Sequence, residues 1–93
     1  MRMTRQEFLA SSGLDVRTLE WWLEQEWLIP EKTASGVRFG DIDIARARFI
    51  RELKDDIGAN DEGIGVILHL VDQLHGMRQA LAELRKGMKG SSD

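Results

Sequence analysis

The chain has 93 residues, no cysteine and a formal net charge of −3. This length fits one small domain near the lower limit of independent stability, so help from a partner subunit is expected. The lack of cysteine excludes disulfides and thiolate chemistry, and the acidic balance argues against non-specific nucleic-acid binding. No stretch offers the roughly 20 apolar residues that span a bilayer, and the N-terminal residues lack the pattern of a secretion signal. We therefore expect a cytoplasmic protein with no membrane partner.

Two short helices are predicted near the N-terminus. Thr4 and Glu7 form the Thr-x-x-Glu pattern of a capping box, and Gly13 is placed to end the first helix in the left-handed conformation. Asp15 is a suitable N-cap for a second helix over residues 16–26. One face of this second helix is apolar and consists of Leu19, Trp22 and Leu23. Two short helices joined by a four-residue turn indicate a helix-turn-helix.

A small hairpin and a third helix follow. Pro30 ends helical structure, and residues 31–40 contain a Ser-Gly turn followed by an alternating Val-Arg-Phe, which predicts a β-hairpin or wing. Asp41 is expected to cap a third helix over residues 42–57, which Gly58 ends. The inward stripe of this helix is predicted to consist of Ile42, Ala45, Phe49, Leu53 and Ile57.

The last predicted helix, over residues 61–89 with Asn60 as its cap, has an apolar heptad pattern. Its positions are Ile67, Leu70, Leu74, Met77, Leu81, Leu84 and Met88, of which the six from Leu70 onward are the predicted dimerisation residues. Such a helix is about 43 Å long, so its far half either pairs with a second copy or folds back onto its own domain. We divide the chain into a helix-turn-helix at 1–57, a helix for dimerisation and partner binding at 58–89 and a frayed tail at 90–93.

The order of these elements resembles the winged-helix MerR group of regulators over about residues 4–75. The positions that match its pattern are Thr18, Leu19, Trp21, Trp22, Leu28, Ile29, Arg38 and Phe39. The resemblance implies an all-α, MerR-like winged helix-turn-helix with a small β-hairpin wing and a long C-terminal dimerisation helix. It also implies, as one candidate function, a sequence-specific transcription regulator. Its phosphate contacts would be Arg5, Arg17, Lys32, Arg38, Arg46 and Arg48.

The chain departs from the DNA-binding pattern in the helix that would enter the groove. Glu20 stands where those members carry Arg, Leu23 where they carry Glu, and Trp27 in place of a glycine. The predicted second helix carries one arginine and three glutamates. Like charges at 4–6 Å cost on the order of 1 kcal/mol each even with solvent screening, so DNA is an unfavourable partner for this helix.

Residues 55–76 resemble a second family. Gly58, Asn60, Gly63 and Ile64, followed by an apolar run and Asp-Gln, are similar to chaperone modulators of the CbpM type; heat-shock repressors of the HspR kind share parts of the segment. The CbpM-type proteins are degenerate MerR-like proteins that bind the J-domain of the DnaJ-like co-chaperone CbpA. The resemblance implies a homodimeric modulator that occupies a J-domain and inhibits its stimulation of Hsp70.

The residues proposed to contact this partner are one tryptophan and five carboxylates. They are Trp21, Asp55, Asp56, Asp61, Glu62 and Asp72. No lysine or arginine lies between Lys54 and Arg78, which fits either a solvated helix surface or a landing site for the basic helix of a J-domain. Trp21 lies away from the face of Trp22, so its indole either contacts a partner or is buried at the edge of the core.

No cofactor, metal or enzymatic activity is expected. His69 and Asp72 are neighbours on a helix while His75 points away, and two ligands do not make a typical metal site. Gly63 and Gly65 lack the Gly-Lys-Ser/Thr of a phosphate loop and are interpreted as positions of close helix packing. No pairing of a nucleophile with a base is present in the sequence.

Overall fold

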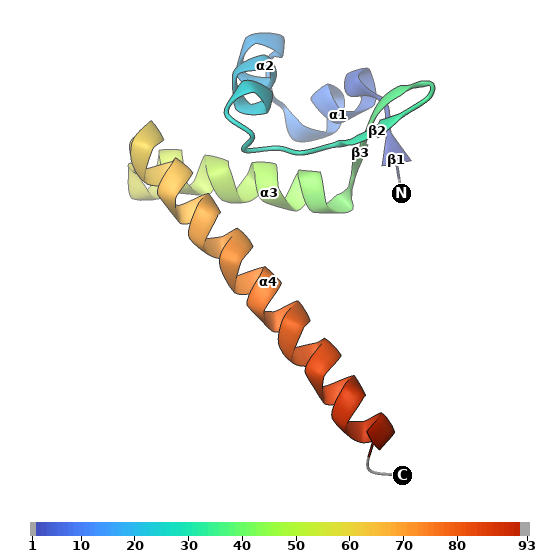
Figure 1. The fold of residues 1–93 in the computed structure, drawn as a ribbon. Coiled ribbons are helices and arrows are strands. Elements are labelled where there is room, and N and C mark those ends of the chain that lie inside the picture. The colour runs from blue at the N-terminus through green and yellow to red at the C-terminus, as the bar shows by residue number, and fades with distance from the viewer. Residues whose placement is uncertain (1, 92–93) are drawn as a thin grey trace.

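The computed structural model describes residues 2–91, with side chains through Met88. Figure 1 shows the earlier helices and a small sheet gathered into one body, from which the last helix projects. In chain order the elements are β1 (Arg2–Met3), α1 (Arg5–Ser12), α2 (Val16–Glu24), β2 (Glu31–Thr33), β3 (Gly36–Gly40), α3 (Asp41–Glu52), a π-helical turn η1 (Leu53–Ile57) and α4 (Asp61–Ser91).

Side-chain caps hold α1 and α2 where the sequence predicts them. The Thr4 hydroxyl accepts a hydrogen bond from the Glu7 N–H at 3.2 Å, and the Glu7 carboxylate accepts one from the Thr4 N–H at 2.9 Å. Gly13 follows α1 with φ of 74°. Asp15 accepts the Thr18 N–H at 2.7 Å, and this backbone bond lowers the pKa of Asp15. The predicted helix-turn-helix is confirmed.

The end of α2 is a Schellman motif. The Trp27 N–H donates to the Trp22 carbonyl at 2.9 Å, and the Glu26 N–H donates to the Leu23 carbonyl at 3.1 Å, which are the two bonds of that motif. Glu26 has φ of 60°, a conformation that favours glycine. The resemblance assigned the missing glycine to Trp27, but the left-handed residue is Glu26. Trp27 instead turns inward and packs on Trp22 with ring centroids 6.1 Å apart.

The fold is not purely α-helical, because a three-stranded antiparallel sheet in the order β1-β3-β2 lies beside the helices. The predicted hairpin is confirmed as β2 and β3, with Lys32 opposite Val37. The third strand was not predicted: β1 adds to the other edge, with Met3 opposite Phe39. Two residues are too few to show a periodicity, so no pattern indicates β1.

Helix α3 is rotated about its axis relative to the prediction. Ile42 and Ile57 are 72% and 73% exposed, Ala45 is exposed and Phe49 is half-buried, so only Leu53 of the predicted stripe is buried. The buried side chains of α3 and η1 are Asp43, Ala47, Ile50 and Leu53.

A hydrogen bond from the preceding strand explains this rotation. Gly40, not Asp41, is the N-cap of α3, and it has no side chain to close the first turn. The Asp43 carboxylate accepts the Gly40 N–H at 2.8 Å instead, which turns Asp43 inward and Ile42 outward. The helix then widens into the π-helical turn η1 and ends at Gly58, where φ is 77°.

The first turns of α4 belong to the core, and the rest of the helix projects from the domain. The Asn60 side chain accepts the Gly63 N–H at 2.7 Å, which confirms the predicted cap. Ile64 and Leu68 are buried in the core, with Ile67 packed at its edge. Beyond them α4 leaves the domain, as Figure 1 shows. The core consists of Met3, Phe8, Leu19, Trp22, Trp27, Leu28, Phe39, Ala47, Ile50, Leu53, Ile64 and Leu68.

Candidate partner-binding surface

Two indoles meet where α2 ends and α4 begins. Trp21 and Trp27 are in an edge-to-face arrangement with centroids 5.0 Å apart, a favoured geometry for aromatic pairs. Trp27 is buried, whereas Trp21 is 37% exposed. The Schellman motif creates this pair, because it returns the chain across the end of α2 and places Trp27 beneath Trp21. Trp21 is therefore neither fully buried nor isolated: it covers Trp27 and leaves part of its indole open to solvent.

An open groove of about 570 Å³ runs from this indole pair along α4. Its lining is Trp21, Gln25, Trp27, Asp61, Glu62, Gly65, Val66, His69 and Leu70. The α4 members recur at helical spacing, so one face of α4 forms a wall of the groove. A Cβ on Gly65 would lie 3.8 Å from the Trp27 Nε1, and the absence of a larger side chain there keeps the groove open. We call this the indole groove.

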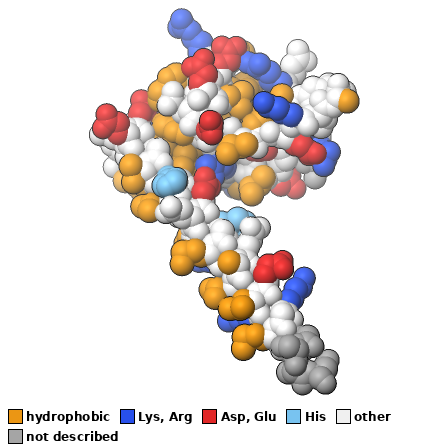
Figure 2. Space-filling model, in the orientation of Figure 1, with side chains coloured by type: hydrophobic (Ala, Val, Ile, Leu, Met, Phe, Trp, Pro, Cys, Tyr) orange, Lys and Arg blue, Asp and Glu red, His pale blue; other side chains and the backbone are white. Residues whose placement is uncertain are grey.

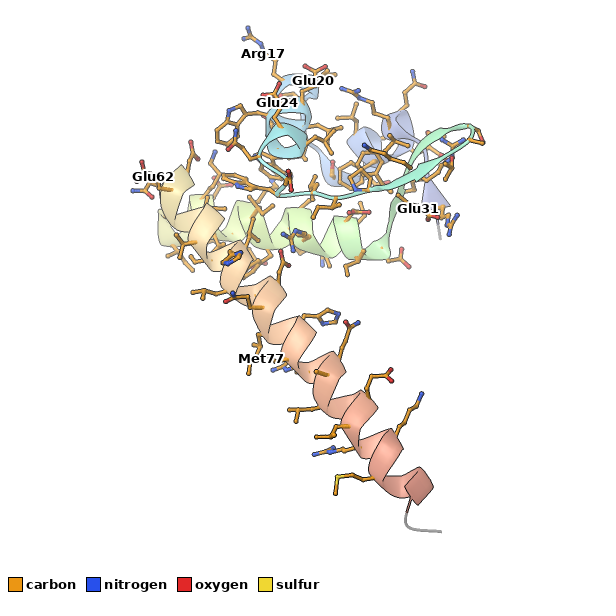
Figure 3. All side chains as sticks on the ribbon, in the orientation of Figure 1. Arg17, Glu20, Glu24, Glu31, Glu62 and Met77 are labelled. Atoms are coloured by element: carbon orange, nitrogen blue, oxygen red, sulfur yellow. The ribbon has the colours of Figure 1, made fainter. Side chains whose placement is uncertain are left out.

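A second hollow of about 520 Å³ continues from the indole groove along α2. The two share Trp21 and Asp61. Its other lining residues are Arg17, Thr18, Glu20, Trp22, Glu24 and Lys54. Figure 3 shows Glu20 and Glu24 on the outer side of α2, with Arg17 extending from its outer end into solvent and Glu62 at the start of α4. Together the two hollows form one elongated surface of aromatic and acidic side chains.

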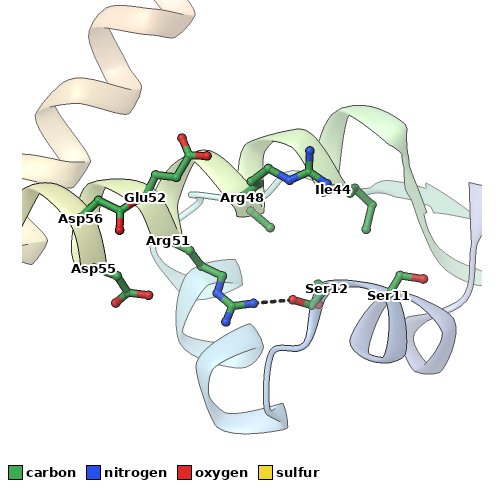
Figure 4. Close-up of a pocket in the computed structure, with 9 residues that line it drawn as sticks. Ser11, Ser12, Ile44, Arg48, Arg51, Glu52, Asp55 and Asp56 are labelled. Carbon is green, nitrogen blue, oxygen red and sulfur yellow. Dashed lines mark hydrogen bonds between the residues drawn. The ribbon is translucent and has the colours of Figure 1, made fainter.

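The structure brings together three of the six side chains predicted to contact a partner. Trp21, Asp61 and Glu62 line the indole groove. Asp55 and Asp56 lie on η1 and line a different pocket, which Figure 4 shows with Ser11, Ser12, Arg48 and Arg51. In that pocket the Arg51 guanidinium donates to the Ser12 carbonyl at 2.7 Å.

Asp72, the sixth predicted contact, is engaged inside the molecule. Its two oxygens accept hydrogen bonds from Arg46 at 2.7 and 3.1 Å. This hydrogen-bonded guanidinium lowers the pKa of Asp72, against a smaller opposing effect of burial. The Nε of Arg46 also donates to the Trp27 carbonyl. Arg46 therefore joins α3 to α4 and to the chain that follows α2.

The candidate phosphate contacts do not form one surface either. Arg5 is paired with Glu20 at 3.0 Å, Arg38 donates to the Val37 carbonyl at 3.0 Å, and Arg46 is bound internally. Among the described residues, the candidate cations without an ion pair or side-chain hydrogen bond are Arg17, Lys32 and Arg48.

The heptad residues of α4 are exposed along its length. Leu70, Leu74, Met77, Leu81, Leu84 and Met88 are between 48% and 65% exposed. Figure 2 shows hydrophobic side chains following the projecting helix away from the domain. We call these six heptad residues the α4 seam. Leu70 is also part of the indole groove, so the seam begins where the groove ends. An exposed apolar stripe of this length is unusual on a monomer.

The described residues contain no cluster of three or more His, Asp or Glu side chains that could hold a metal ion. His69 lines the indole groove, whereas His75 lines a separate hollow against α3. Within the part of the chain that the structure describes, no helix has both the length and the apolar character needed to cross a membrane.

The element order defines a winged helix-turn-helix with a long C-terminal helix. A family model described as "MerR HTH family regulatory protein" matches residues 3–86. The match covers nearly the whole chain, and the protein belongs to this family. Comparisons with curated proteins and with solved structures gave no match.

Proposed function

We propose that the protein is a chaperone modulator that binds the J-domain of a DnaJ/CbpA-like co-chaperone and inhibits its stimulation of Hsp70. The observation that carries this proposal is the charge of the surface around α2. The solvent side of that helix presents Glu20, Glu24 and an exposed indole, and the groove beside it adds Asp61 and Glu62. Such a surface repels a polyanion and complements a basic helix.

The inhibition needs no catalytic chemistry. A J-domain stimulates Hsp70 through one surface, so a protein that occupies this surface competes with Hsp70. Accordingly we propose no cofactor and no enzymatic activity. We also propose that the protein acts in the cytoplasm as a homodimer held by the α4 seam, because pairing of two seams would remove the exposed apolar side chains from water.

The alternative is a MerR-family transcription regulator, and family membership favours it. The helix-turn-helix and wing are complete, and Arg17, Lys32 and Arg48 remain exposed for contacts with phosphates. Against it, α2 has two outward carboxylates, and Arg5 and Arg46 are engaged with Glu20 and Asp72.

Direct binding of a purified J-domain tests the proposal. Calorimetry with the wild-type protein should give saturable binding with one J-domain per protomer. Asp61→Asn with Glu62→Gln should weaken it about tenfold, because these side chains line the indole groove. Asp55→Asn with Asp56→Asn makes the same charge change on the other pocket and serves as the matched control. Absence of binding by the wild-type protein, with a mobility shift of a defined DNA duplex, would establish the alternative instead.

A further inference from the structure

The indole groove contains an unused hydrogen-bond donor as well as apolar walls. Among the described residues no acceptor is bound to the Trp27 indole N–H, and this nitrogen is not fully enclosed by protein. It faces Gly65, where a Cβ would lie only 3.8 Å away. The floor of the groove therefore offers an N–H that an entering partner can satisfy.

The charged side chains that line the indole groove and the second hollow set the sign of the partner. Glu20 is paired with Arg5 at 3.0 Å, and Asp61 with Lys54 at 3.7 Å. Glu24 on α2 lines the second hollow and Glu62 on α4 lines the indole groove, and neither has an ion pair among the described residues. The cations of this lining are Lys54, which is paired, and Arg17, which extends into solvent, so they are outnumbered by the carboxylates. A cation bound between Glu24 and Glu62 would also lie against Trp21, which lines both hollows, and this adds a cation–π attraction.

The shape of the surface favours a helix over a small molecule. Two contiguous hollows of about 570 and 520 Å³ share Trp21 and Asp61, and both are open along their length. Small-molecule sites enclose most of their ligand, whereas an open apolar groove accepts the apolar face of an amphipathic helix through side chains spaced three and four residues apart. Partly exposed tryptophan is a frequent anchor of such contacts.

The geometry points to the indole groove as the seat of a basic amphipathic helix from a partner protein. An apolar side chain of that helix lies against Val66 and Leu70, and a polar side chain accepts a hydrogen bond from the Trp27 indole N–H beside Gly65. A lysine or arginine lies against Trp21 between Glu24 and Glu62. Under the proposed function, this helix is the part of the J-domain that the groove recognises. Binding of a J-domain rests on the proposed function, whereas binding of a basic helix does not.

Two model peptides test the recognition itself. Both are 15-residue amphipathic helices without tryptophan that share one pattern of leucine with a glutamine beside it, whose amide oxygen can accept from the Trp27 N–H. The remaining polar positions are lysine in one peptide and glutamate in the other. Binding is followed by the tryptophan fluorescence of the full chain. The lysine peptide should bind at least tenfold more tightly than the glutamate peptide and weaken with salt. Equal affinity for both peptides, or no binding of the lysine peptide, overturns the inference.

Matched variants locate the site on the protein. Gly65→Leu fills the groove and Glu62→Lys reverses its rim charge, so each should lower the affinity for the lysine peptide at least tenfold. Gly76→Leu and Glu83→Lys make the same changes on exposed positions of α4, where a Cβ at Gly76 meets nothing within 4 Å. These controls should stay within twofold, and circular dichroism verifies that all four variants are folded. Equal losses in test and control variants overturn the site.

Measuring J-domain binding to the same variants separates the groove proposal from the proposed function. If the lysine peptide binds and Gly65→Leu abolishes its binding, the groove is supported even when no J-domain binds. If a J-domain binds and Gly65→Leu and Glu62→Lys leave its affinity unchanged, the groove inference is overturned and the proposed function stands. If Gly65→Leu abolishes self-association and spares peptide binding, a second copy occupies the groove and the inference is again overturned.

Discussion

Glu26 holds a backbone conformation that its own side chain disfavours. Its φ of 60° follows from the Schellman bonds that bring Trp27 beneath Trp21. A non-glycine residue in the left-handed conformation costs roughly 1–2 kcal/mol. Glycine would remove this cost, but the greater entropy of its unfolded chain would cancel part of the gain.

We expect Glu26→Gly to leave the free energy of unfolding unchanged or raise it by up to about 1 kcal/mol. Glu26→Val should lower it by at least about 1 kcal/mol, because a β-branched side chain is strongly disfavoured at positive φ. Urea unfolding followed by circular dichroism measures both. A valine variant as stable as the glycine variant would contradict the assignment of this backbone position.

Arg46 joins two segments that are far from it in the sequence. It binds the Trp27 carbonyl and both oxygens of Asp72, and the exposed fraction of its side chain is 18%. We expect Arg46→Ala to destabilise the protein by about 1–3 kcal/mol, since it removes charge-assisted hydrogen bonds and leaves a nearly buried carbonyl without its donor. Arg48→Ala, on the exposed side of α3, should change stability by less than about 0.5 kcal/mol.

The ion pair between Arg46 and Asp72 should make the free energy of unfolding depend on pH. The Arg46 guanidinium lowers the pKa of Asp72, so the pair stabilises the fold above the ordinary aspartate pKa of about 3.9. This contribution is lost as the pH falls through the lowered value of the folded state. Half-exposure of the Asp72 side chain keeps the effect small. The stability difference between wild type and Asp72→Asn should therefore shrink from pH 7 to pH 3, and should be absent at both pH values in an Arg46→Ala background.

Among the elements, the starts of the helices could be predicted from the sequence, because each start depends on residues that are close together in the chain. Thr4, Asp15 and Asn60 cap their helices through residues three positions away, and such contacts are visible as short motifs. The rotation of α3 depends on whether Asp43 or Asp41 closes the first turn. Both residues are acidic and follow Gly40, so the pattern alone favoured the wrong one.

The indole groove could be predicted only in part, because its walls come from separate segments. Trp21 and Glu62 were predicted as contacts from exposure and charge. The approach of Gly65 to Trp27 was not predicted, since these residues are far apart in sequence and meet only through the Schellman turn and the packing of Ile64 and Leu68. The ion pair of Asp72 with Arg46, 26 residues away, was not predicted either.

The charge of α2 leads to a prediction about DNA. Glu24 is exposed on α2 and has no ion pair among the described residues. If carboxylates keep this helix from a duplex, Glu24→Arg should raise affinity for a 20-base-pair duplex about tenfold at low salt and steepen its salt dependence. Glu83→Arg makes the same charge change on α4 and should have a much smaller effect. Equal gains in fluorescence anisotropy titrations would show that only net charge matters.

At the scale of the whole molecule, the extent of 54 Å along the longest axis reflects the projecting α4. The seam leaves apolar side chains in water unless a second copy covers them. Sedimentation equilibrium should give a dimer for the wild type and a monomer for Leu74→Glu with Leu81→Glu. The off-seam control Glu83→Gln should remain dimeric. A monomeric wild type at micromolar concentration would contradict self-pairing of the seam.

We propose that this helix-turn-helix, with its acidic surface, captures a J-domain in place of DNA. The steady-state ATPase rate of Hsp70, stimulated by a full-length DnaJ-like co-chaperone, tests it most directly. Addition of the wild-type protein should return the rate to its unstimulated value, with half-inhibition near the Kd of the J-domain, and excess co-chaperone should restore stimulation. A stimulated rate that stays constant while the protein saturates the J-domain of the co-chaperone would show that this binding does not inhibit stimulation of Hsp70.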